Sequence, residues 1–341
     1  MFYFNCDYME GCHPEVLARL TETNLEQCIG YGEDDYCARA AEIIRDRFDC
    51  PGAAVHFLVG GTQTNTVVIS SVLRPFEGVI CAETGHINVH ETGAIEATGH
   101  KVLAVPSEDG LIRPEQIDRV MKEQGDDEHI VRPGMVYISF PTEVGTLYTL
   151  SQLEDIYAAC RRWGLYLFID GARLGYGLTA EECDVTPADI ARCSDAFYIG
   201  GTKVGALFGE AVVITHPDMM PRFRYMMKRA GGLLAKGRLL GVQFIALLEN
   251  DLYFDIAEKA VQQAGKIRQK LLDKGIPLMV DSPTNQLFPI FTAEQMAALT
   301  ADFGLAVWKT YDDGRTAARI CTSWCTPDEQ VDALMEAIER V

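Results

Sequence analysis

Short runs of apolar residues recur along the first two thirds of the chain and alternate with longer amphipathic stretches. The runs have the length of buried strands, and the stretches between them carry apolar residues at helical spacing. This alternation predicts an α/β fold with a mostly parallel sheet covered by helices on both faces. The predicted strands of this region are residues 55–59, 78–82, 101–105, 135–139, 165–169 and 195–200, with 211–215 as a hairpin-like return.

The helices predicted between these strands include residues 66–73, 86–98, 114–124, 150–163 and 186–192. A long helical zone follows, from residue 217 to about 275, without comparable strand content. Short strands then alternate with helices, which is an α+β pattern and suits a second, smaller domain. We therefore predict an N-terminal segment plus large domain over residues 1–244 and a small C-terminal domain over residues 245–341.

Composition narrows the class of protein. The formal net charge of −19 argues against a nucleic acid or an anionic membrane as partner, because either needs a basic face. The 11 cysteines are odd in number and form no CxxC pair, which is typical of reduced core cysteines in a cytoplasmic protein. We find neither a signal peptide nor an apolar run near the roughly 20 residues that a membrane span needs. A cytoplasmic location is expected.

Two charged residues lie just beyond the ends of predicted strands. Asp170 directly follows the strand over residues 165–169, and Lys203 comes three residues after the strand over residues 195–200, behind two glycines and a threonine. These are the groups that pyridoxal phosphate chemistry requires, because a lysine forms a Schiff base with the cofactor aldehyde and an aspartate keeps the pyridine nitrogen protonated. Taken singly, each residue also has a non-catalytic explanation, because Asp170 can be a helix cap and Lys203 a solvated loop lysine. The small, apolar neighbours of Lys203 favour a neutral, nucleophilic amine.

Two further motifs precede these residues. Gly61 and Thr62 lie between a predicted strand and a helix, where backbone N–H groups can bind an anion, although a glycine turn with a threonine cap fits equally well. His86 has a planar ring that can stack on a cofactor. With His90 it also has the i,i+4 spacing of a helical zinc site, but Ile87 stands where a zinc protease carries glutamate. We expect no metal.

The order of these motifs along the chain is hard to explain by chance. With them, the chain resembles the threonine aldolase/β-eliminating lyase family of pyridoxal phosphate (PLP) enzymes. Members of that family have the aspartate aminotransferase fold, called fold type I, so the resemblance implies a PLP-dependent transferase-like architecture. The motifs that carry it are GYGED at residues 30–34, GT at 61–62, ETGH at 83–86, PTE at 141–143, DGAR at 170–173 and GGTK at 200–203.

The resemblance implies a role for each matching residue. Lys203 is expected to be the Schiff-base lysine and Asp170 the partner of the pyridine nitrogen. His86 is expected to stack on the cofactor ring. The backbone of Gly61 and the hydroxyl of Thr62 are expected to hold the phosphate.

Other matching residues bear on the substrate and on a second subunit. The resemblance implies that Arg173 and Arg319 lie near the cofactor hydroxyl and the substrate carboxylate; from its place in the chain, Arg173 is also able to pair with Asp170. Arg229 or Lys228 is expected to reach a phosphate, across a subunit interface. Two positions depart from many family members: Cys6 stands where a serine helps to hold the carboxylate, and Glu143 where a histidine faces the substrate hydroxyl.

The reaction that the resemblance implies is retro-aldol cleavage of L-threonine, L-allo-threonine or a similar β-hydroxy-α-amino acid to glycine and an aldehyde. Either His86 or Glu143 is the expected base. Other pyridoxal phosphate reactions, namely β-elimination, racemisation and transamination, stay open. A metal-dependent hydrolase built on His86, His90 and a nearby glutamate and a non-catalytic binding protein also stay open. The expected partners are a small amino-acid substrate and further copies of the chain, in a homodimer or homotetramer.

Overall fold

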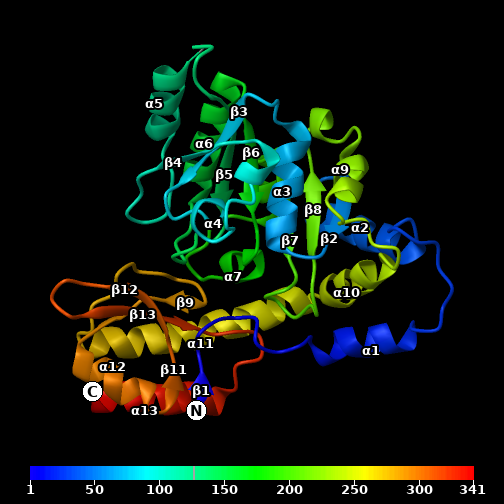
Figure 1. Ribbon diagram of the computed structural model, residues 1–341. Coiled ribbons are helices and arrows are strands. Elements are labelled where there is room, and N and C mark those ends of the chain that lie inside the picture. The colour runs from blue at the N-terminus through cyan, green and yellow to red at the C-terminus, as the bar shows by residue number, and fades with distance from the viewer. Residues whose placement is uncertain (126) are drawn as a thin grey trace.

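The computed structural model describes residues 1–125 and 127–341. Its larger part is built on a seven-stranded sheet with the strand order β2-β8-β7-β6-β5-β3-β4 (Figure 1). Strand β8 is antiparallel to both of its neighbours, and the other pairs are parallel. The mostly parallel sheet and its antiparallel return are therefore confirmed. The strands are β2 (Ala54–Leu58), β3 (Glu77–Ala82), β4 (Val102–Val105), β5 (Arg132–Ser139), β6 (Tyr166–Asp170), β7 (Ala196–Gly200) and β8 (Glu210–Ile214).

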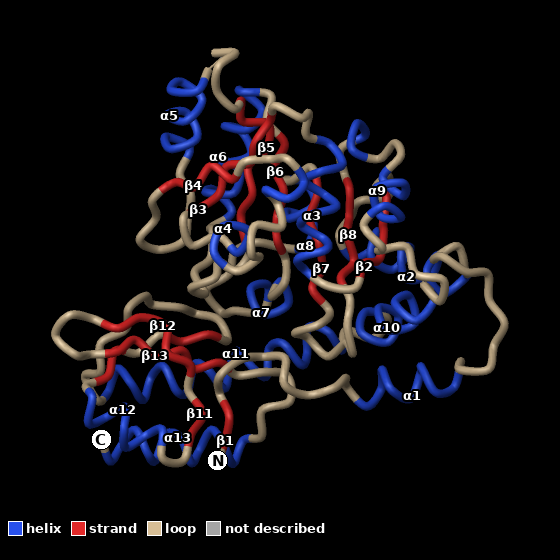
Figure 2. The backbone as a smooth tube through the Cα atoms, in the orientation of Figure 1, coloured by secondary structure: helices blue, strands red, loops and turns tan. Residues whose placement is uncertain are grey.

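Helices bury both faces of this sheet (Figure 2). Because successive side chains of a strand point to opposite faces, Tyr137 packs in one core and Ile138 in the other. The first core is closed by helices α3 (Gly61–Val72) and α9 (Phe223–Arg229). The helices that contribute to the second core include α2 (Asp35–Arg47), α5 (Pro114–Gln124), α6 (Leu150–Trp163), α7 (Leu174–Leu178), α8 (Pro187–Arg192) and α10 (Arg238–Leu248).

A smaller part with its own core lies beside the large sheet, and both chain termini belong to it (Figure 1). Its strands run in the order β10-β13-β12, and β9 also pairs with β13. The first strand of the chain, β1 (Phe2–Tyr3), pairs with β11 (Phe303–Gly304). The remaining elements of this part are β9 (Gln286–Leu287), β10 (Ile290–Phe291), α12 (Ala293–Thr300), β12 (Ala306–Thr310), β13 (Thr316–Cys321) and α13 (Asp328–Arg340).

Helix α11 (Leu252–Asp273) connects the two parts. Near its start Tyr253 packs in the core of the large sheet, whereas Ile267 and Leu271 pack in the core of the smaller part. The limit predicted at residue 245 falls within α10, which packs against the large sheet. The division at that residue stays a prediction. Helix α1 (Pro14–Glu22) lies to one side and contacts α10.

Two helices next to site residues have bounds that differ from the predicted ones. The helix predicted from residue 66 begins at Gly61, directly after the extended Gly60. The helix predicted over residues 86–98 ends after one turn, as α4 (His86–Val89). Thr92 and Gly93 have φ angles of 52° and 72°, which are incompatible with a right-handed helix. Two single 3₁₀ turns, η1 (Glu96–Thr98) and η2 (Pro217–Met219), complete the elements.

Across residues 1–125 and 127–341, no helix combines the length and the apolar character needed to cross a membrane.

Candidate active site

A cavity of about 850 Å³ lies where the carboxyl ends of the parallel strands face β12 and β13 of the smaller part. Ligands of open α/β sheets bind beyond these strand ends. The cavity brings together predicted site residues from segments far apart in the chain. Those that line it are Gly61, Thr62, His86, Glu143, Asp170, Arg173, Lys203 and Arg319.

Asp170, the last residue of β6, is buried at the cavity and accepts hydrogen bonds on both carboxylate oxygens. Tyr137 Oη donates to Oδ2 at 2.5 Å, and Asn65 Nδ2 donates to the same oxygen at 3.2 Å. Tyr198 Oη and the backbone N–H of Ala172 donate to Oδ1. Burial alone would raise the pKa of Asp170, but the charge of a protonated His86 and these hydrogen bonds lower it below the ordinary value. The carboxylate is therefore held ionised.

The ring of His86 is oriented by a buried carboxylate that sequence reasoning missed. Glu91 Oε1 contacts Nδ1 of His86 at 2.7 Å and also accepts from Asn65 Nδ2 at 2.7 Å. Because Asn65 also donates to Asp170, one amide connects the histidine and the aspartate. With Nδ1 engaged, Nε2 is the ring nitrogen of His86 left for a ligand. Glu91 lies five residues after His86 in the sequence, and this short separation was a weak signal that the two side chains interact.

Glu143 is buried between β5 and the start of α4. Its Oε1 accepts from Ser139 Oγ at 2.6 Å and from the backbone N–H of His86 at 2.9 Å. Burial raises the pKa of Glu143, while the bond from Ser139 partly offsets the rise. A carboxyl whose pKa is raised in a cavity is a better proton acceptor once ionised.

Lys203 follows β7 and lines the cavity, with its Nζ 5.9 Å from the ring centre of Tyr8. Its amine makes no hydrogen bond or ion pair with any described residue. Burial lowers the pKa of Lys203 and so does the charge of Arg173, whereas Asp7, Asp170 and Glu210 act in the opposite direction. The resulting amine is easier to deprotonate than an exposed lysine, as the sequence predicts.

Glu210, the first residue of β8, is a second buried carboxyl that sequence reasoning missed. Thr202 Oγ1 donates to its Oε1 at 2.8 Å, and its Oε2 is buried without a partner in the described part of the chain. Burial raises the pKa of Glu210, and the hydrogen bond from Thr202 and the charge of Lys203 partly offset the rise. In the sequence, the only indication that Glu210 belongs to the site was its position seven residues after Lys203.

Arg173 pairs with Asp7 and not with Asp170, which corrects one of the two predicted alternatives. Nε donates to Oδ2 of Asp7 at 2.7 Å and NH2 donates to Oδ1 at 3.0 Å. Asn285 Nδ2 donates to the same carboxylate at 2.9 Å. Burial alone would raise the pKa of Asp7, but Arg173 and then Lys203 hold it at about 2. Asp7 is another residue that the sequence did not single out.

Arg319, on β13, reaches the cavity from the smaller part. Its Nε and NH2 donate to the backbone carbonyl of Asn5 at 3.0 and 2.6 Å. A guanidinium has five N–H donors, so three remain for a ligand. The outer edge of Arg319 can therefore bind a carboxylate at two points.

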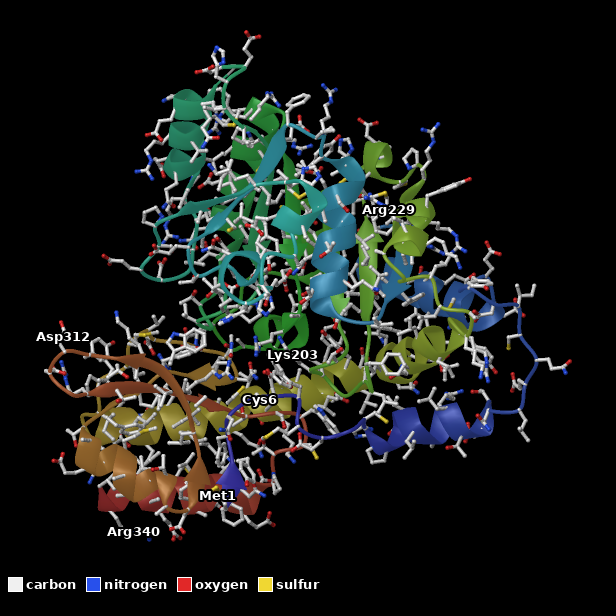
Figure 3. All side chains as sticks on the ribbon, viewed as in Figure 1. Met1, Cys6, Lys203, Arg229, Asp312 and Arg340 are labelled. Atoms are coloured by element: carbon white, nitrogen blue, oxygen red, sulfur yellow. The ribbon has the colours of Figure 1, made fainter. Side chains whose placement is uncertain are left out.

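Two predicted residues are not part of this lining. Cys6 is half-buried, and from its segment Tyr8 lines the cavity instead. Arg229 is exposed at the end of α9, and Figure 3 shows it well away from Lys203 in the same chain. The roles predicted for Cys6 and Arg229 stay predictions.

The start of α3 fits an anion. Its N-cap, Gly60, has no side chain to accept from the first N–H groups, which stay available to a phosphate. A Cβ atom on Gly61 would stand 3.2 Å from Tyr198 Oη, so glycine permits a close approach here. The cavity thus combines an anion cradle, an ionised carboxylate and a free lysine amine, which are the groups that pyridoxal phosphate needs.

The beta-eliminating lyase family model matches residues 5–294 of this chain. The chain belongs to this family. The low specificity L-threonine aldolase of Pseudomonas aeruginosa is 33% identical to it over 99% of this chain and 97% of that protein. The solved structure of a threonine aldolase from Leishmania major is 45% identical, with a TM-score of 0.98 over 100% of this chain and 99% of that one.

Membership of the beta-eliminating lyase family confirms the resemblance found in the sequence. The aspartate aminotransferase of Thermus thermophilus, at 14% identity, reaches a TM-score of 0.74 over 100% of this chain and 91% of that one. At this identity the likeness concerns the fold alone, and it confirms fold type I. Among the described residues, no three His, Cys, Asp or Glu side chains are close enough together to form a metal-binding site, so the structure offers no ligand set for the zinc alternative.

Proposed function

We propose that this chain is a pyridoxal phosphate-dependent aldehyde lyase that cleaves the Cα–Cβ bond of L-threonine, L-allo-threonine and similar β-hydroxy-α-amino acids. The products are glycine and an aldehyde. The observation that carries the proposal is one cavity holding Lys203, an ionised Asp170 and an oriented His86. It is supported by the identity of 33% along 99% of the chain to a low specificity L-threonine aldolase.

When bound, pyridoxal phosphate supplies an aldehyde that captures amines and a protonated ring that accepts the electron pair left on Cα. Lys203 is the residue that would attach it. The carboxylate of Asp170 would keep the ring nitrogen protonated. The N–H groups at the start of α3, including those of Gly61 and Thr62, would hold the phosphate together with the hydroxyl of Thr62, and His86 would cover one face of the ring.

The substrate would be oriented by Arg319, whose free N–H donors face the cavity. Binding the carboxylate at one end of the molecule leaves the β-hydroxyl directed toward His86 and Glu143. One of these two groups takes the hydroxyl proton as the Cα–Cβ bond breaks, the aldehyde leaves, and a proton returned to Cα completes glycine. Arg173, held by Asp7, adds a further positive charge to the cavity lining.

We further infer a homo-oligomer and a cytoplasmic location. Leu25 and Ile29, in the loop after α1, are 91% and 71% exposed, and a second copy of the chain would cover them in such an assembly. In such an assembly Arg229, which is exposed on its own chain, would be the residue that reaches the cavity of a second copy. All 11 cysteines are free, as expected in a reducing compartment.

The experiment that tests the proposal measures the products of the purified protein supplied with pyridoxal phosphate. With L-threonine or L-allo-threonine, equal amounts of acetaldehyde and glycine should form, and Lys203→Ala should abolish both. A matched control is Lys101→Ala, which removes an exposed lysine outside the cavity lining. Ammonia and a keto acid without glycine would indicate elimination instead, and an active Lys203→Ala variant would contradict the assignment of the lysine.

A further inference from the structure

Strand β12 carries one extra residue where it passes the cavity. Val307 pairs with Ala318 and Lys309 pairs with Ala317, so Trp308 between them has no partner on β13. Successive side chains of a regular strand point to opposite faces, yet Val307 and Trp308 both line the cavity. A bulge has this effect, since it bends the strand and redirects side chains, and bulges are frequent beside active sites.

The indole of Trp308 is held from three sides. The ring of the buried Phe288 meets it edge-on at 5.0 Å between centres. The ring of His90 meets it in the same manner at 6.2 Å. The guanidinium carbon of Arg319 lies 5.6 Å from the indole centre, in cation–π contact. These contacts fix the indole between the expected carboxylate site and the histidine side of the cavity.

The position of Trp308 bears on the substituent that Cβ of the substrate carries besides the hydroxyl, for which no binding residue has been named so far. This step rests on the proposed function, in which Arg319 holds the carboxylate and the β-hydroxyl faces His86 or Glu143. The remaining substituent on Cβ then lies near both Arg319 and His86. We call the lining there the β-substituent wall; its members are Val89, His90, Val307 and Trp308, of which His90 lies 5.5 Å from the ring of His86 and Trp308 contacts Arg319.

We propose that Trp308 is the specificity-determining residue of the β-substituent wall, and that it favours an aromatic β-substituent over the methyl group of threonine. A fixed indole offers a flat apolar surface against which a phenyl ring packs over a large area. Val89 and Val307 are largely exposed at the cavity mouth, so a larger substituent also covers them. A methyl group is too small to contact the whole wall.

The test compares two substrates on the cofactor-loaded enzyme, L-threonine and L-β-phenylserine, in the wild type and in Trp308→Ala. We expect kcat/KM for phenylserine to fall about 10- to 100-fold more than kcat/KM for threonine, mainly through KM. The ratio is the decisive quantity. Any disturbance of Arg319 by loss of the indole affects both substrates alike, because both carry the same carboxylate.

Two further variants sharpen the comparison. Trp308→Phe keeps an aromatic surface and should restore most of the preference for phenylserine. Trp163→Phe is the matched control, because Trp163 donates to Asp118 at the end of α6, outside the cavity, and its loss should leave the ratio as in the wild type. The visible absorbance of the bound cofactor and the unfolding midpoint show whether each variant is folded.

If Trp308→Ala leaves the ratio of the two kcat/KM values unchanged, whether or not both values fall, the role of Trp308 is overturned and the aldolase reaction stays in place. A wild-type enzyme that releases aldehyde from neither substrate would overturn the proposed function, and this inference with it.

Discussion

Asp7 and Arg173 are 166 positions apart in the chain and form a two-point ion pair at 2.7 and 3.0 Å. Arg173 follows a strand of the large sheet, whereas the residues before Asp7 pair with β11 of the smaller part. The first seven residues thus connect the two parts directly at the cavity. Asn285, from the smaller part, donates to the same carboxylate.

Replacing Asp7 with asparagine should destabilise the protein strongly. The substitution leaves the buried charge of Arg173 without its partner, and breaking a buried pair in this way costs about 3–5 kcal/mol. The measurement is the free energy of unfolding in urea. Glu154→Gln is the matched control, because it breaks an exposed pair with Arg192 and should cost far less than the loss of the buried pair. Similar losses in the two variants would contradict a special role for Asp7.

Replacing Glu143 with glutamine should slow the reaction about 10²- to 10⁴-fold if this carboxyl is the base. Burial raises its pKa, so the wild-type rate should rise with pH through that raised value as the carboxyl ionises. The pH dependence of kcat for aldehyde release provides the measurement, and Glu143→Gln should lose this rising limb.

Ser139→Ala gives an independent check of the same assignment. The serine hydroxyl stabilises ionised Glu143, so its removal should raise the pKa of Glu143 and move the rising limb to higher pH. If Glu143→Gln keeps both the rate and the limb, His86 is the base.

Removing the hydroxyl of Tyr137 should weaken the ionised form of Asp170. The hydrogen bond from Tyr137 lowers the pKa of this carboxyl, so Tyr137→Phe should raise it, and activity should fall first at low pH. A hydrogen bond to a charged group is worth about 1.5–3 kcal/mol, which predicts a loss of about 10-fold or more there. Tyr148→Phe, whose hydroxyl accepts from Ile112, is a buried tyrosine control. An equal loss in both variants would indicate a packing effect.

His56 should make the protein less stable in mild acid. Burial lowers its pKa to about 4, and the charge of Arg224 adds to this. Between the unfolded value near 6.5 and about 4, the unfolded chain binds a proton that the folded chain does not, so stability is lost as the pH falls through this window. The loss is at most about 1.4 kcal/mol per pH unit.

The matching measurement is the free energy of unfolding between pH 7 and pH 4.5, compared between the wild type and His56→Gln. The slope should be shallower in His56→Gln. His129→Gln, at an exposed histidine, should keep the wild-type slope. An identical slope in His56→Gln and the wild type would show that His56 does not titrate in this window.

The sequence predicted the sheet and several helices well because their signals are local. Helices α5 and α6 begin and end where predicted: a proline opens the first, and Thr149 with Gln152 caps the second. The short α4 and the early start of α3 were missed, because the positive φ angles at Thr92 and Gly93 and the extended Gly60 leave no strong local pattern.

By itself, the sequence determined that a lysine, an aspartate, a histidine and a glycine-threonine pair follow strands, and parallel strands carry such residues to one edge of the sheet. Only the tertiary structure decided which side chains hold them. Asn65 and Asp170 are 105 positions apart, Asp7 and Arg173 are 166 apart, and Trp308 faces the cavity through a bulge. The physical reason is that local patterns encode strands, helices and turns, whereas contacts between distant side chains arise only when the two cores pack against each other.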